Sequence, residues 1–253
     1  MKVGLIGAGN MARALARGWG DPVLCSDSGS GRAQALVDEL GGEAVSNLEV
    51  AERADLVVLC HKPYQLRQVA EEIRGRPRAV ASVLGGVTLE SLQKAYPGTP
   101  VFRTIPNTAV EVRRGIVCCA ATPELSPYTE LAPAVIALFE RVGTVVSLSE
   151  SLMGPALAVV GVGPAYQALL AEAQVDAAVR YGLAAPLAGR LVAETMAGTA
   201  ALLAQRNFDT LEVRREVTSP GGSTARGLAA LERAGVRSAF QDAMDAVAGW
   251  RPE

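Results

Sequence analysis

The chain has 253 residues, of which 49% are hydrophobic, 20% are charged and 4% are aromatic, and its formal net charge is −2. This length allows one large domain or two medium ones with a sizeable core. A nearly neutral chain with few aromatic side chains lacks the basic stripe and the stacking residues of a nucleic-acid-binding surface, so we expect no nucleic-acid partner.

The cysteines show no C-x-x-C spacing, and His61 is the only histidine. We therefore expect no metal site, and we interpret the thiols as reduced and buried in a cytoplasmic protein. No targeting segment is expected, because Met1-Lys2 leads directly into an apolar run. The cysteines are Cys25, Cys60, Cys118 and Cys119.

Residues 151–171 carry no charge over a length that could span a membrane. Their apolar character comes largely from alanine, and glycines and prolines interrupt them. We interpret this segment as helices that pack against other helices or another subunit, and we expect no membrane partner. The interrupting residues are Gly154, Pro155, Gly161, Gly163 and Pro164.

The N-terminal residues combine a short apolar run, Val3–Ile6, with a glycine-rich turn of the pattern G-x-G-x-x-A. The run predicts a buried parallel strand, and the helical spacing of Met11, Leu15 and Trp19 predicts a helix after the turn. Such glycines permit a tight turn and the approach of a pyrophosphate to the helix N-terminus. We therefore predict dinucleotide binding, and the alternative is a plain strand–helix turn. The turn consists of Gly7-Ala8-Gly9-Asn10-Met11-Ala12.

Asp27 follows the second predicted strand at the spacing of about 20 residues from Gly7 where dinucleotide-binding units carry a ribose-binding acid. An acid there favours NAD(H). Ser28, Ser30 and Arg32 come next, and hydroxyls with a guanidinium can hold a 2′-phosphate. Both NADP(H) and NAD(H) therefore stay open as cofactors.

The first half of the chain alternates predicted strands and helices. Ser46 and Glu49 have capping-box spacing and predict the start of a short helix. Residues 103–107 are expected to form a turn at the ligand crevice. Further strands are expected at 23–26, 56–60, 79–84, 101–104, 116–120 and 144–148, and further helices at 88–94 and 127–141.

His61, Lys62 and Pro63 follow the strand expected at 56–60. The carboxyl ends of strands in such sheets face the ligand crevice, so Lys62 is expected over the cofactor, and the alternative is an ordinary solvated lysine. For His61 we favour a residue packed beside the cofactor over a catalytic acid.

From about residue 149 onward the pattern contains only helices, rich in alanine and leucine. Helices that are apolar on several faces need partners on several sides, which indicates a subunit interface. Gly182 and Gly235 stand where helix C-termini prefer glycine. We therefore predict an α/β chain: a Rossmann-type doubly wound sheet over 1–148, followed by an all-α dimerisation domain over 149–253. The predicted helices are 164–181, 186–205, 211–216, 224–234 and 238–250.

One stretch of the helical half, residues 216–232, begins with helix breakers, Pro220 and Gly221-Gly222. A helix pattern follows, with Ser223 or Thr224 as its expected N-cap. A glycine-lined loop that ends at a helix N-terminus can bind a carboxylate or a phosphate. The alternative is a helix start after a tight turn.

These motifs together resemble the pyrroline-5-carboxylate reductase family, which catalyses the last step of proline synthesis, and the resemblance runs nearly end to end. Its most specific part is Val217-Thr-Ser-Pro-Gly-Gly-Ser-Thr224 with Leu231-Glu232. The other matching segments are Ile6 to Ala12, Lys62-Pro63, Arg103-Thr-Ile-Pro-Asn107 and Gly161-Val-Gly-Pro-Ala-Tyr166.

The resemblance implies a Rossmann domain and a helical domain that interlocks with a second subunit, giving a homodimer or a higher homo-oligomer. It implies that a cyclic imine carboxylate lies between the nicotinamide and the Ser219–Thr224 loop, with Thr224 also forming a hydrogen bond with the ring nitrogen. The implied pyrophosphate site is Gly7, Gly9, Asn10 and Met11. The implied adenosine and nicotinamide-ribose side is Asn47, Lys62 and Pro63. The implied substrate-carboxylate site is Ser219, Gly221, Gly222, Ser223 and Thr224.

The chain departs from the family pattern at three positions. Val162 stands where serine is usual, His61 where a small apolar residue is usual, and Ile105 where methionine is usual. None of these changes removes a group that the chemistry requires, although Val162 removes a hydroxyl near the crevice.

A protonated cyclic imine is already electrophilic, so its reduction needs positioning and charge complementarity more than a strong general acid. The absence of lysine and histidine from residue 149 onward fits this chemistry. The alternatives are an imine reductase or a β-hydroxyacid-type dehydrogenase for another small substrate, and a non-catalytic dinucleotide-binding regulatory protein. A β-hydroxyacid-type enzyme would need a lysine in the helical half.

Overall fold

The structure is a computed structural model that describes residues 1–121 and 131–248. The chain divides into two compact units. The first comprises Met1–Pro164 and the C-terminal segment that begins at Ala246, and the second comprises Ala165–Asp245.

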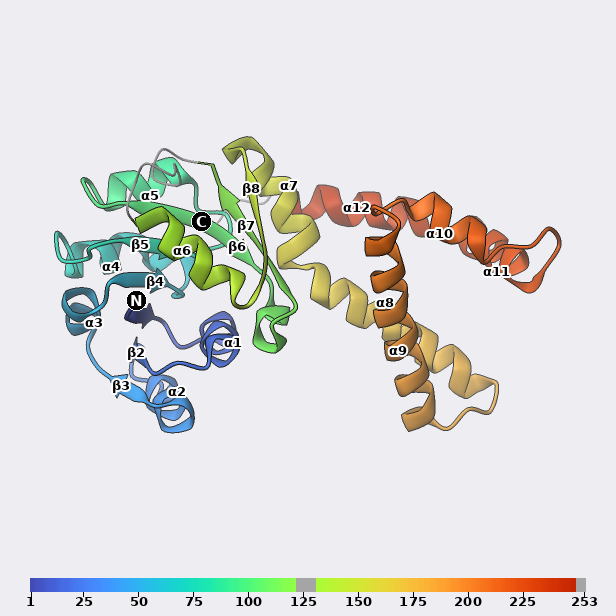
Figure 1. Cartoon of the computed structure of the whole chain (residues 1–253), viewed down its shortest axis with the longest axis horizontal. Helices are drawn as coiled ribbons and strands as arrows, with labels where there is room; N and C mark the ends of the chain where they lie inside the picture. The colour runs from blue at the N-terminus through green and yellow to red at the C-terminus, as the bar shows by residue number, and fades with distance from the viewer. Residues whose placement is uncertain (122–130, 249–253) are drawn as a thin grey trace. The chain divides into compact units, whose positions relative to one another are not determined.

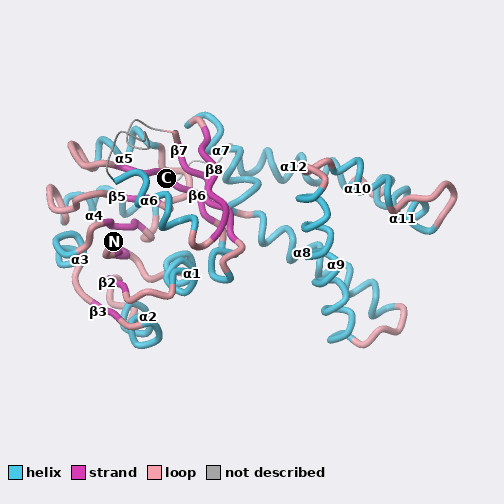
Figure 2. Tube along the Cα trace, in the orientation of Figure 1, coloured by secondary structure: helices cyan, strands magenta, loops and turns pink. Residues whose placement is uncertain are grey.

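All strands of the described residues belong to one eight-stranded sheet in the first unit, drawn in magenta in Figure 2. Their order across the sheet is β3-β2-β1-β4-β5-β6-β7-β8. This order confirms the predicted Rossmann-type fold. The strands are β1 (Val3–Ile6), β2 (Val23–Ser26), β3 (Gly42–Ala44), β4 (Leu56–Leu59), β5 (Val80–Ser82), β6 (Val101–Pro106), β7 (Gly115–Ala120) and β8 (Gly143–Leu148).

Strand β1 lies in parallel between β2 and β4, and Gly4 aligns with Leu24 on one side and Val57 on the other. After β1 the chain forms β2 and β3 on one side of it and then crosses back to form β4 on its other side. The turns that follow β1 and β4 therefore lie next to each other, at the place where open parallel sheets bind ligands. The strand direction reverses only between β6 and β7.

Helices cover both faces of this sheet (Figure 1). One core cluster joins α1, α2 and α6 to the sheet through Trp19, Leu36 and Phe139, and another joins α3, α4 and α5 through Val50, Val69 and Leu92. The Trp19 indole donates a hydrogen bond of 3.0 Å to the Leu138 carbonyl. The helices are α1 (Asn10–Trp19), α2 (Arg32–Leu40), α3 (Asn47–Arg53), α4 (Leu66–Glu72), α5 (Leu89–Ala95) and α6 (Leu131–Glu140), with 3₁₀ turns η1 (Pro63–Gln65) and η2 (Thr108–Val112).

Three expectations for the first unit need correction or qualification. The turn expected at residues 103–107 is wrong, because β6 continues to Pro106, pairing with β5 as far as Arg103 and with β7 from Thr104 onward. Strand β3 was not predicted, since its residues are exposed and it is only three residues long. The helix expected at 127–141 is observed as α6 over Leu131–Glu140, and residues 127–130 lie outside the described residues.

The residues that follow β8 pack against β6 and β7 rather than away from the sheet. Met153 and Val160 form a small core with Ile105, Cys118 and Ala120. Because of this packing, residues 149–164 belong to the first compact unit. The domain boundary expected after residue 148 stays a prediction. The elements are η4 (Glu150–Leu152), α7 (Met153–Ala156) and a π-helical turn, η5 (Leu157–Gly161).

The second unit is helical throughout. Its elements are α8 (Gly163–Arg180), α9 (Ala185–Gln205), α10 (Thr210–Glu216), α11 (Ser223–Arg233) and α12 (Val236–Ala248), of which α8 begins and α12 ends in the first unit. These bounds agree with the five predicted helices to within two residues, and residues 249–250 lie outside the described residues. Gly182 and Gly235 both have a left-handed backbone, as expected at helix ends.

The described residues of the second unit bury very little apolar surface. Helices α8, α11 and α12 have no buried residue, and only Ala188 and Val213 are buried hydrophobic residues in this unit. Large apolar side chains remain exposed instead, among them Leu169, Tyr181, Leu187, Leu191, Phe208 and Leu231. A unit of this kind has no adequate core of its own.

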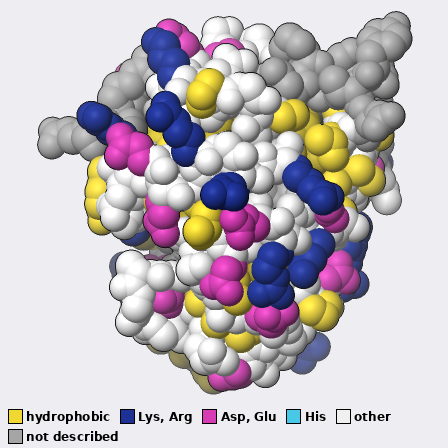
Figure 3. Space-filling model, turned by 90° about the vertical axis from the view of Figure 1, so that its left-hand side faces the viewer, with side chains coloured by type: hydrophobic (Ala, Val, Ile, Leu, Met, Phe, Trp, Pro, Cys, Tyr) yellow, Lys and Arg dark blue, Asp and Glu magenta, His cyan; other side chains and the backbone are white. Residues whose placement is uncertain are grey.

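The first unit has a different kind of surface. Figure 3 shows basic and acidic side chains side by side on the face that it presents, with scattered apolar ones. Exposed ion pairs in this unit include Arg53–Glu43, Arg67–Glu71 and Arg76–Glu52. Exposed pairs of this kind contribute little to stability but keep a surface well solvated.

Candidate functional site

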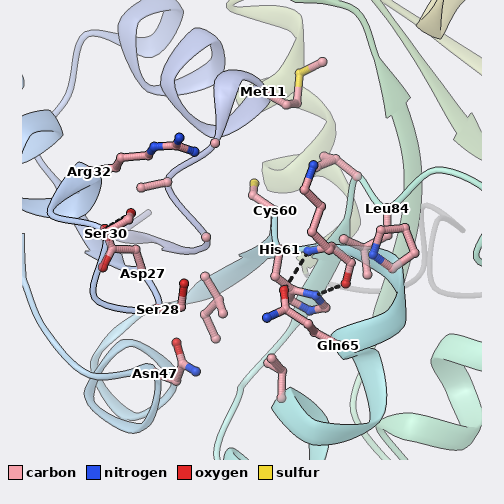
Figure 4. Close-up of a pocket in the computed structure, with 18 of the residues that line it drawn as sticks. Met11, Asp27, Ser28, Ser30, Arg32, Asn47, Cys60, His61, Gln65 and Leu84 are labelled. Atoms are coloured by element: carbon pink, nitrogen blue, oxygen red, sulfur yellow. Dashed lines mark hydrogen bonds between the residues drawn. The ribbon is translucent and has the colours of Figure 1, made fainter.

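A cavity of about 750 Å³ opens at the carboxyl ends of β1, β2 and β4 (Figure 4). Its volume lies within the range of cofactor pockets. All nine residues predicted to bind the cofactor line it: Gly7, Gly9, Asn10, Met11, Asp27, Ser28, Asn47, Lys62 and Pro63. The structure thus brings together predicted residues from four separate segments of the chain.

The two glycines of the first turn are suited to their positions for different structural reasons. Gly7 has a φ of 103°, and a Cβ there would lie 2.6 Å from the Cys60 carbonyl carbon and from the His61 backbone nitrogen. Gly9 has an ordinary φ of −75°, and a Cβ there would meet no atom within 4 Å. The fold therefore requires Gly7, whereas the absence of a side chain at Gly9 leaves space for a ligand.

Gly9 is also the N-cap of α1, and no side chain caps this end of the helix. The first N–H groups of a helix lack partners within the helix, and the helix dipole favours negative charge beside them. A pyrophosphate fits this position by charge, by hydrogen bonding and by the space over Gly9. The cavity therefore suits a dinucleotide cofactor.

Asp27 lies at the end of β2, but the loop that follows it uses its carboxylate. Oδ1 accepts a hydrogen bond of 2.8 Å from Gly29 N, and Oδ2 accepts hydrogen bonds from the Ser30 hydroxyl at 2.8 Å and from Ala33 N at 3.0 Å. Partial burial alone would raise the pKa of Asp27, but the bonds from Ala33, Ser30 and Gly29 lower it to about 2. Asp27 is therefore a carboxylate at neutral pH.

Asn47 joins two other parts of the cavity wall. Its Oδ1 accepts a hydrogen bond of 2.6 Å from the Ser26 hydroxyl, and its Nδ2 donates one of 2.7 Å to the Glu72 carboxylate. The preceding residue, Ser46, forms the predicted capping box with Glu49 and so positions the start of α3. These contacts fix the orientation of the Asn47 amide.

The segment after β4 forms another wall. The His61 ring nitrogen Nδ1 lies 2.8 Å from the Lys62 carbonyl, which can only accept, so Nδ1 carries the proton. Burial lowers the pKa of His61 below its usual range, so the imidazole is neutral at neutral pH. This state fits a packed wall residue and not a catalytic acid. The Lys62 side chain is exposed at the cavity.

Sequence reasoning missed one wall of the cavity. Helix α4 and the turn before it contribute Gln65, Gln68, Val69 and Glu72, and the end of β5 contributes Val83, Leu84 and Gly85. The second group could have been found, because it lies at the carboxyl end of the strand predicted at 79–84, at the same edge of the sheet. The first group follows Pro63 and carries no motif of its own.

The five predicted substrate-binding residues lie at one loop–helix junction in the second unit. Gly221 has a φ of 69°, which favours glycine, and Gly222 N donates a hydrogen bond of 3.1 Å to the Ser219 carbonyl. The expected N-cap was wrong: Gly222 is the N-cap of α11, Ser223 and Thr224 are its first residues, and no side chain caps it. The tight turn at Ser219–Gly222 brings the chain into the helix one residue earlier than expected.

Two hydrogen bonds to neighbouring backbone carbonyls stabilise this loop. The Thr218 hydroxyl donates to the Arg214 carbonyl at 2.5 Å, and Arg226 Nε donates to the Gly221 carbonyl at 3.3 Å. Ser219 and Ser223 are exposed and Thr224 is half-buried. The junction therefore presents hydroxyls and the N-terminal amides of an 11-residue helix, a set of donors suited to an anion.

Among the described residues, no group of three or more His, Cys, Asp or Glu side chains gathers as metal ligands do. The four cysteines are free, and burial raises the pKa of the Cys25 and Cys119 thiols to about 12.

Two stretches, Glu150–Arg180 and Ala185–Gln205, are long and apolar enough to cross a membrane by length and composition alone. The first contains the π-helical turn η5 and three charged residues near its end, Glu172, Asp176 and Arg180.

Comparisons with known proteins agree on one family. The family model for pyrroline-5-carboxylate reductase dimerisation matches residues 150–250, and the model described as NADP oxidoreductase, coenzyme F420-dependent, matches residues 2–85. The chain is 35% identical to a pyrroline-5-carboxylate reductase of Synechocystis over 97% of this chain and 95% of the relative. It is 32% identical to one of Thermus thermophilus over 97% and 95% of the two chains.

Solved structures give the same answer. A 1-pyrroline-5-carboxylate reductase of Streptococcus pyogenes matches with a TM-score of 0.89 and 26% identity over 98% of this chain and 96% of that chain. A pyrroline carboxylate reductase of Plasmodium falciparum, described with NADP bound, matches with a TM-score of 0.87 and 25% identity over 98% and 95%. The chain therefore belongs to the pyrroline-5-carboxylate reductase family and is an NAD(P)H-dependent oxidoreductase.

Proposed function

We propose that this protein reduces 1-pyrroline-5-carboxylate to L-proline by hydride transfer from NAD(P)H, as the last step of proline biosynthesis in the cytoplasm. The observation that carries this proposal is the junction of Ser219–Gly222 with α11, which offers uncapped helix amides and hydroxyls to a carboxylate. The relatives named as pyrroline-5-carboxylate reductases and the cavity that suits a dinucleotide support the same reaction.

The chemistry asks the chain for positioning rather than for a strong acid. When bound, the reduced nicotinamide supplies the hydride that the ring carbon of the protonated imine accepts. Gly7 and Gly9 give the dinucleotide its place, and Asn10 and Met11 offer amides to its pyrophosphate. Ser219, Gly221, Gly222 and Ser223 hold the substrate carboxylate. The Thr224 hydroxyl oxygen accepts a hydrogen bond from the protonated ring nitrogen and so orients the carbon that is reduced.

We further propose that the helical part works as a homodimer or a higher homo-oligomer. Helices α8 and α9 expose Leu169, Leu187 and Leu191, and so little of the second unit is buried that a second copy must cover it. The match of residues 150–250 to a dimerisation model supports the same assembly.

The test is an absorbance assay of NADPH and NADH oxidation with three kinds of substrate: pyrroline-5-carboxylate, piperideine-type imines and simple keto acids. We expect rapid turnover only with pyrroline-5-carboxylate. Preference for another imine or for a keto acid would instead indicate a different imine reductase or a β-hydroxyacid-type dehydrogenase. Cofactor binding without turnover of any of them would indicate a non-catalytic regulatory protein.

A further inference from the structure

We propose that Arg226 makes the Ser219–Thr224 loop selective for a ring that carries a carboxylate, because it holds a positive charge beside the backbone donors of that loop. This inference rests on the proposed function, since it assigns a specificity-determining residue to the same substrate site. Arg226 is the fourth residue of α11, and it is exposed. It supplies the charge that the neutral hydroxyls and amides of the loop lack.

The side chain of Arg226 points back toward the loop. Its Nε donates a hydrogen bond of 3.3 Å to the carbonyl of Gly221, five residues earlier in the chain. Side chains on a helix lean toward the helix N-terminus, so an arginine at this position reaches the preceding loop without strain. The guanidinium group therefore lies at the loop and not along the flank of the helix.

The backbone at this end of α11 offers further donors to the same place. Arg226 N donates a hydrogen bond of 3.2 Å to the carbonyl of the N-cap residue, Gly222. The N–H groups of Ser223, Thr224 and Ala225 come before this bond and have no partner within the helix. No side chain caps them. An anion bound here receives backbone N–H groups and faces a guanidinium, and both favour negative charge.

The charge of Arg226 is available to a ligand. Among the described residues its guanidinium forms no ion pair, and its one hydrogen bond goes to a backbone carbonyl. The two glutamates nearest to it in the sequence are paired with other arginines, Glu216 with Arg206 at 2.8 Å and Glu232 with Arg237 at 2.7 Å. The remaining N–H groups of Arg226 can therefore bind a carboxylate, to which a guanidinium is well matched in geometry.

The charges around the loop have the same effect. Residues 214–233 contain four arginines and two glutamates, so this stretch carries a net charge of +2. A positive field attracts the carboxylate of a substrate. A cyclic imine without a carboxylate brings only its protonated nitrogen, which the same field repels. Arg226 therefore distinguishes two rings of the same size by their charge.

The test compares 1-pyrroline-5-carboxylate with 1-pyrroline, which lacks the carboxylate, as substrates of the full-length protein at saturating NADPH or NADH. We expect the wild type to have a higher kcat/KM for the ring with the carboxylate. Arg226→Gln keeps an N–H donor at the position of Nε, so it can still bond to Gly221, but it removes the charge. It should raise the KM for 1-pyrroline-5-carboxylate about tenfold at a nearly unchanged kcat, and it should not weaken 1-pyrroline.

Two further variants separate the charge from the support of the loop. Arg226→Lys keeps the charge and should recover most of the lost affinity for 1-pyrroline-5-carboxylate. Arg233→Gln removes an exposed arginine from the last turn of the same helix and should change neither substrate. Added salt should raise the KM for 1-pyrroline-5-carboxylate more in the wild type than in Arg226→Gln, because salt screens the charge.

An unchanged KM for 1-pyrroline-5-carboxylate in Arg226→Gln would overturn the inference. An equal loss for both rings would overturn it as well, because Arg226 would then only support the loop. Both results leave the proposed function intact, since the wild type still reduces 1-pyrroline-5-carboxylate. A wild type that reduces neither ring would instead overturn the proposed function, and this inference with it.

Discussion

The guanidinium of Arg103 lies against the carboxylate of Glu150, and this pair joins the central strand β6 to the first turn after the sheet. The Arg103 side chain is only 8% exposed. The same Glu150 oxygen accepts a hydrogen bond of 3.0 Å from Leu89 N at the start of α5. One carboxylate therefore connects three elements that are far apart in the sequence.

Replacing Glu150 should destabilise the first unit. Glu150→Ala leaves the buried Arg103 charge without its partner, and we expect a loss of about 3 kcal/mol in the free energy of unfolding. Glu150→Gln should cost less, because the amide still accepts a hydrogen bond. Urea unfolding measures both. Glu90→Gln, which breaks an exposed pair with Lys94, is the control and should leave the midpoint unchanged. An Ala variant as stable as the control would show that the pair does not support the fold.

The two glycines of the first turn should respond differently to alanine. Gly7→Ala meets backbone atoms at 2.6 Å in a left-handed conformation, so we expect it to destabilise the protein by roughly 2 kcal/mol or more. Gly9→Ala meets no protein atom, so its melting temperature should stay near the wild-type value while the affinity for NADP⁺ falls. Thermal melts with and without NADP⁺ distinguish the two effects. A Gly9→Ala protein with unchanged affinity would remove Gly9 from the pyrophosphate site.

Asp27 should make stability depend on pH at the acidic end. Its pKa is lowered from 3.8 to about 2 in the folded protein, so its contribution is fully present above about pH 4 and is lost as the pH falls toward 2. We expect Asp27→Asn to cost roughly 1–2 kcal/mol at pH 7, after allowance for solvent screening, and progressively less between pH 4 and pH 2. Denaturant unfolding from pH 7 to pH 2 measures this. A wild-type advantage that stayed constant over that range would contradict the assignment.

Thr224 should matter for the imine and not for the cofactor. We expect Thr224→Ala to lower kcat/KM for pyrroline-5-carboxylate on the order of 10- to 1000-fold, as for the loss of one transition-state hydrogen bond. Its affinity for NADP⁺ should be nearly unchanged. Thr144→Ala, at an exposed position on β8, is the matched control. Wild-type turnover in the Thr224 variant would exclude this residue from the reaction.

The exposed leucines of α9 should be required for the protein to form an oligomer. Leu191 is 48% exposed, and Leu191→Asp places a charge where we propose that a second copy packs. We expect light scattering after size exclusion to show a shift to monomer, with loss of activity. Leu48→Asp, at a leucine 37% exposed on α3, should keep the oligomer. If both variants assemble like the wild type, the interface must lie elsewhere.

Local patterns predicted the elements that depend on near neighbours. The apolar run Val3–Ile6 and the helical spacing after it gave the correct strand, turn and helix. The Ser46–Glu49 capping box formed as expected. In the helical half, glycines after Tyr181 and Ala234 marked helix ends, because only short-range backbone geometry is involved.

The errors occur where distant residues decide. Residues 103–107 were expected to turn, but β5 pairs with Arg103 and β7 pairs with residues 104–106, and this pairing holds the chain extended as far as Pro106. Strand β3 has no apolar pattern and exists because β2 lies beside it. The N-cap of α11 is Gly222 and not Ser223 or Thr224, because the turn from Ser219 to Gly222 brings the chain into the helix one residue earlier than expected.

By itself, the sequence determined the family, the Rossmann-type sheet and nine of the residues that line the cofactor cavity, since motif spacing and strand ends are local properties. Only the tertiary structure decided what those residues do there. It showed that Gly7 is required by the backbone of Cys60 and His61 while Gly9 is not, and that the Asp27 carboxylate is occupied by its own loop. The physical reason is that hydrogen-bond partners and free space around an atom depend on segments that the chain brings together only by folding.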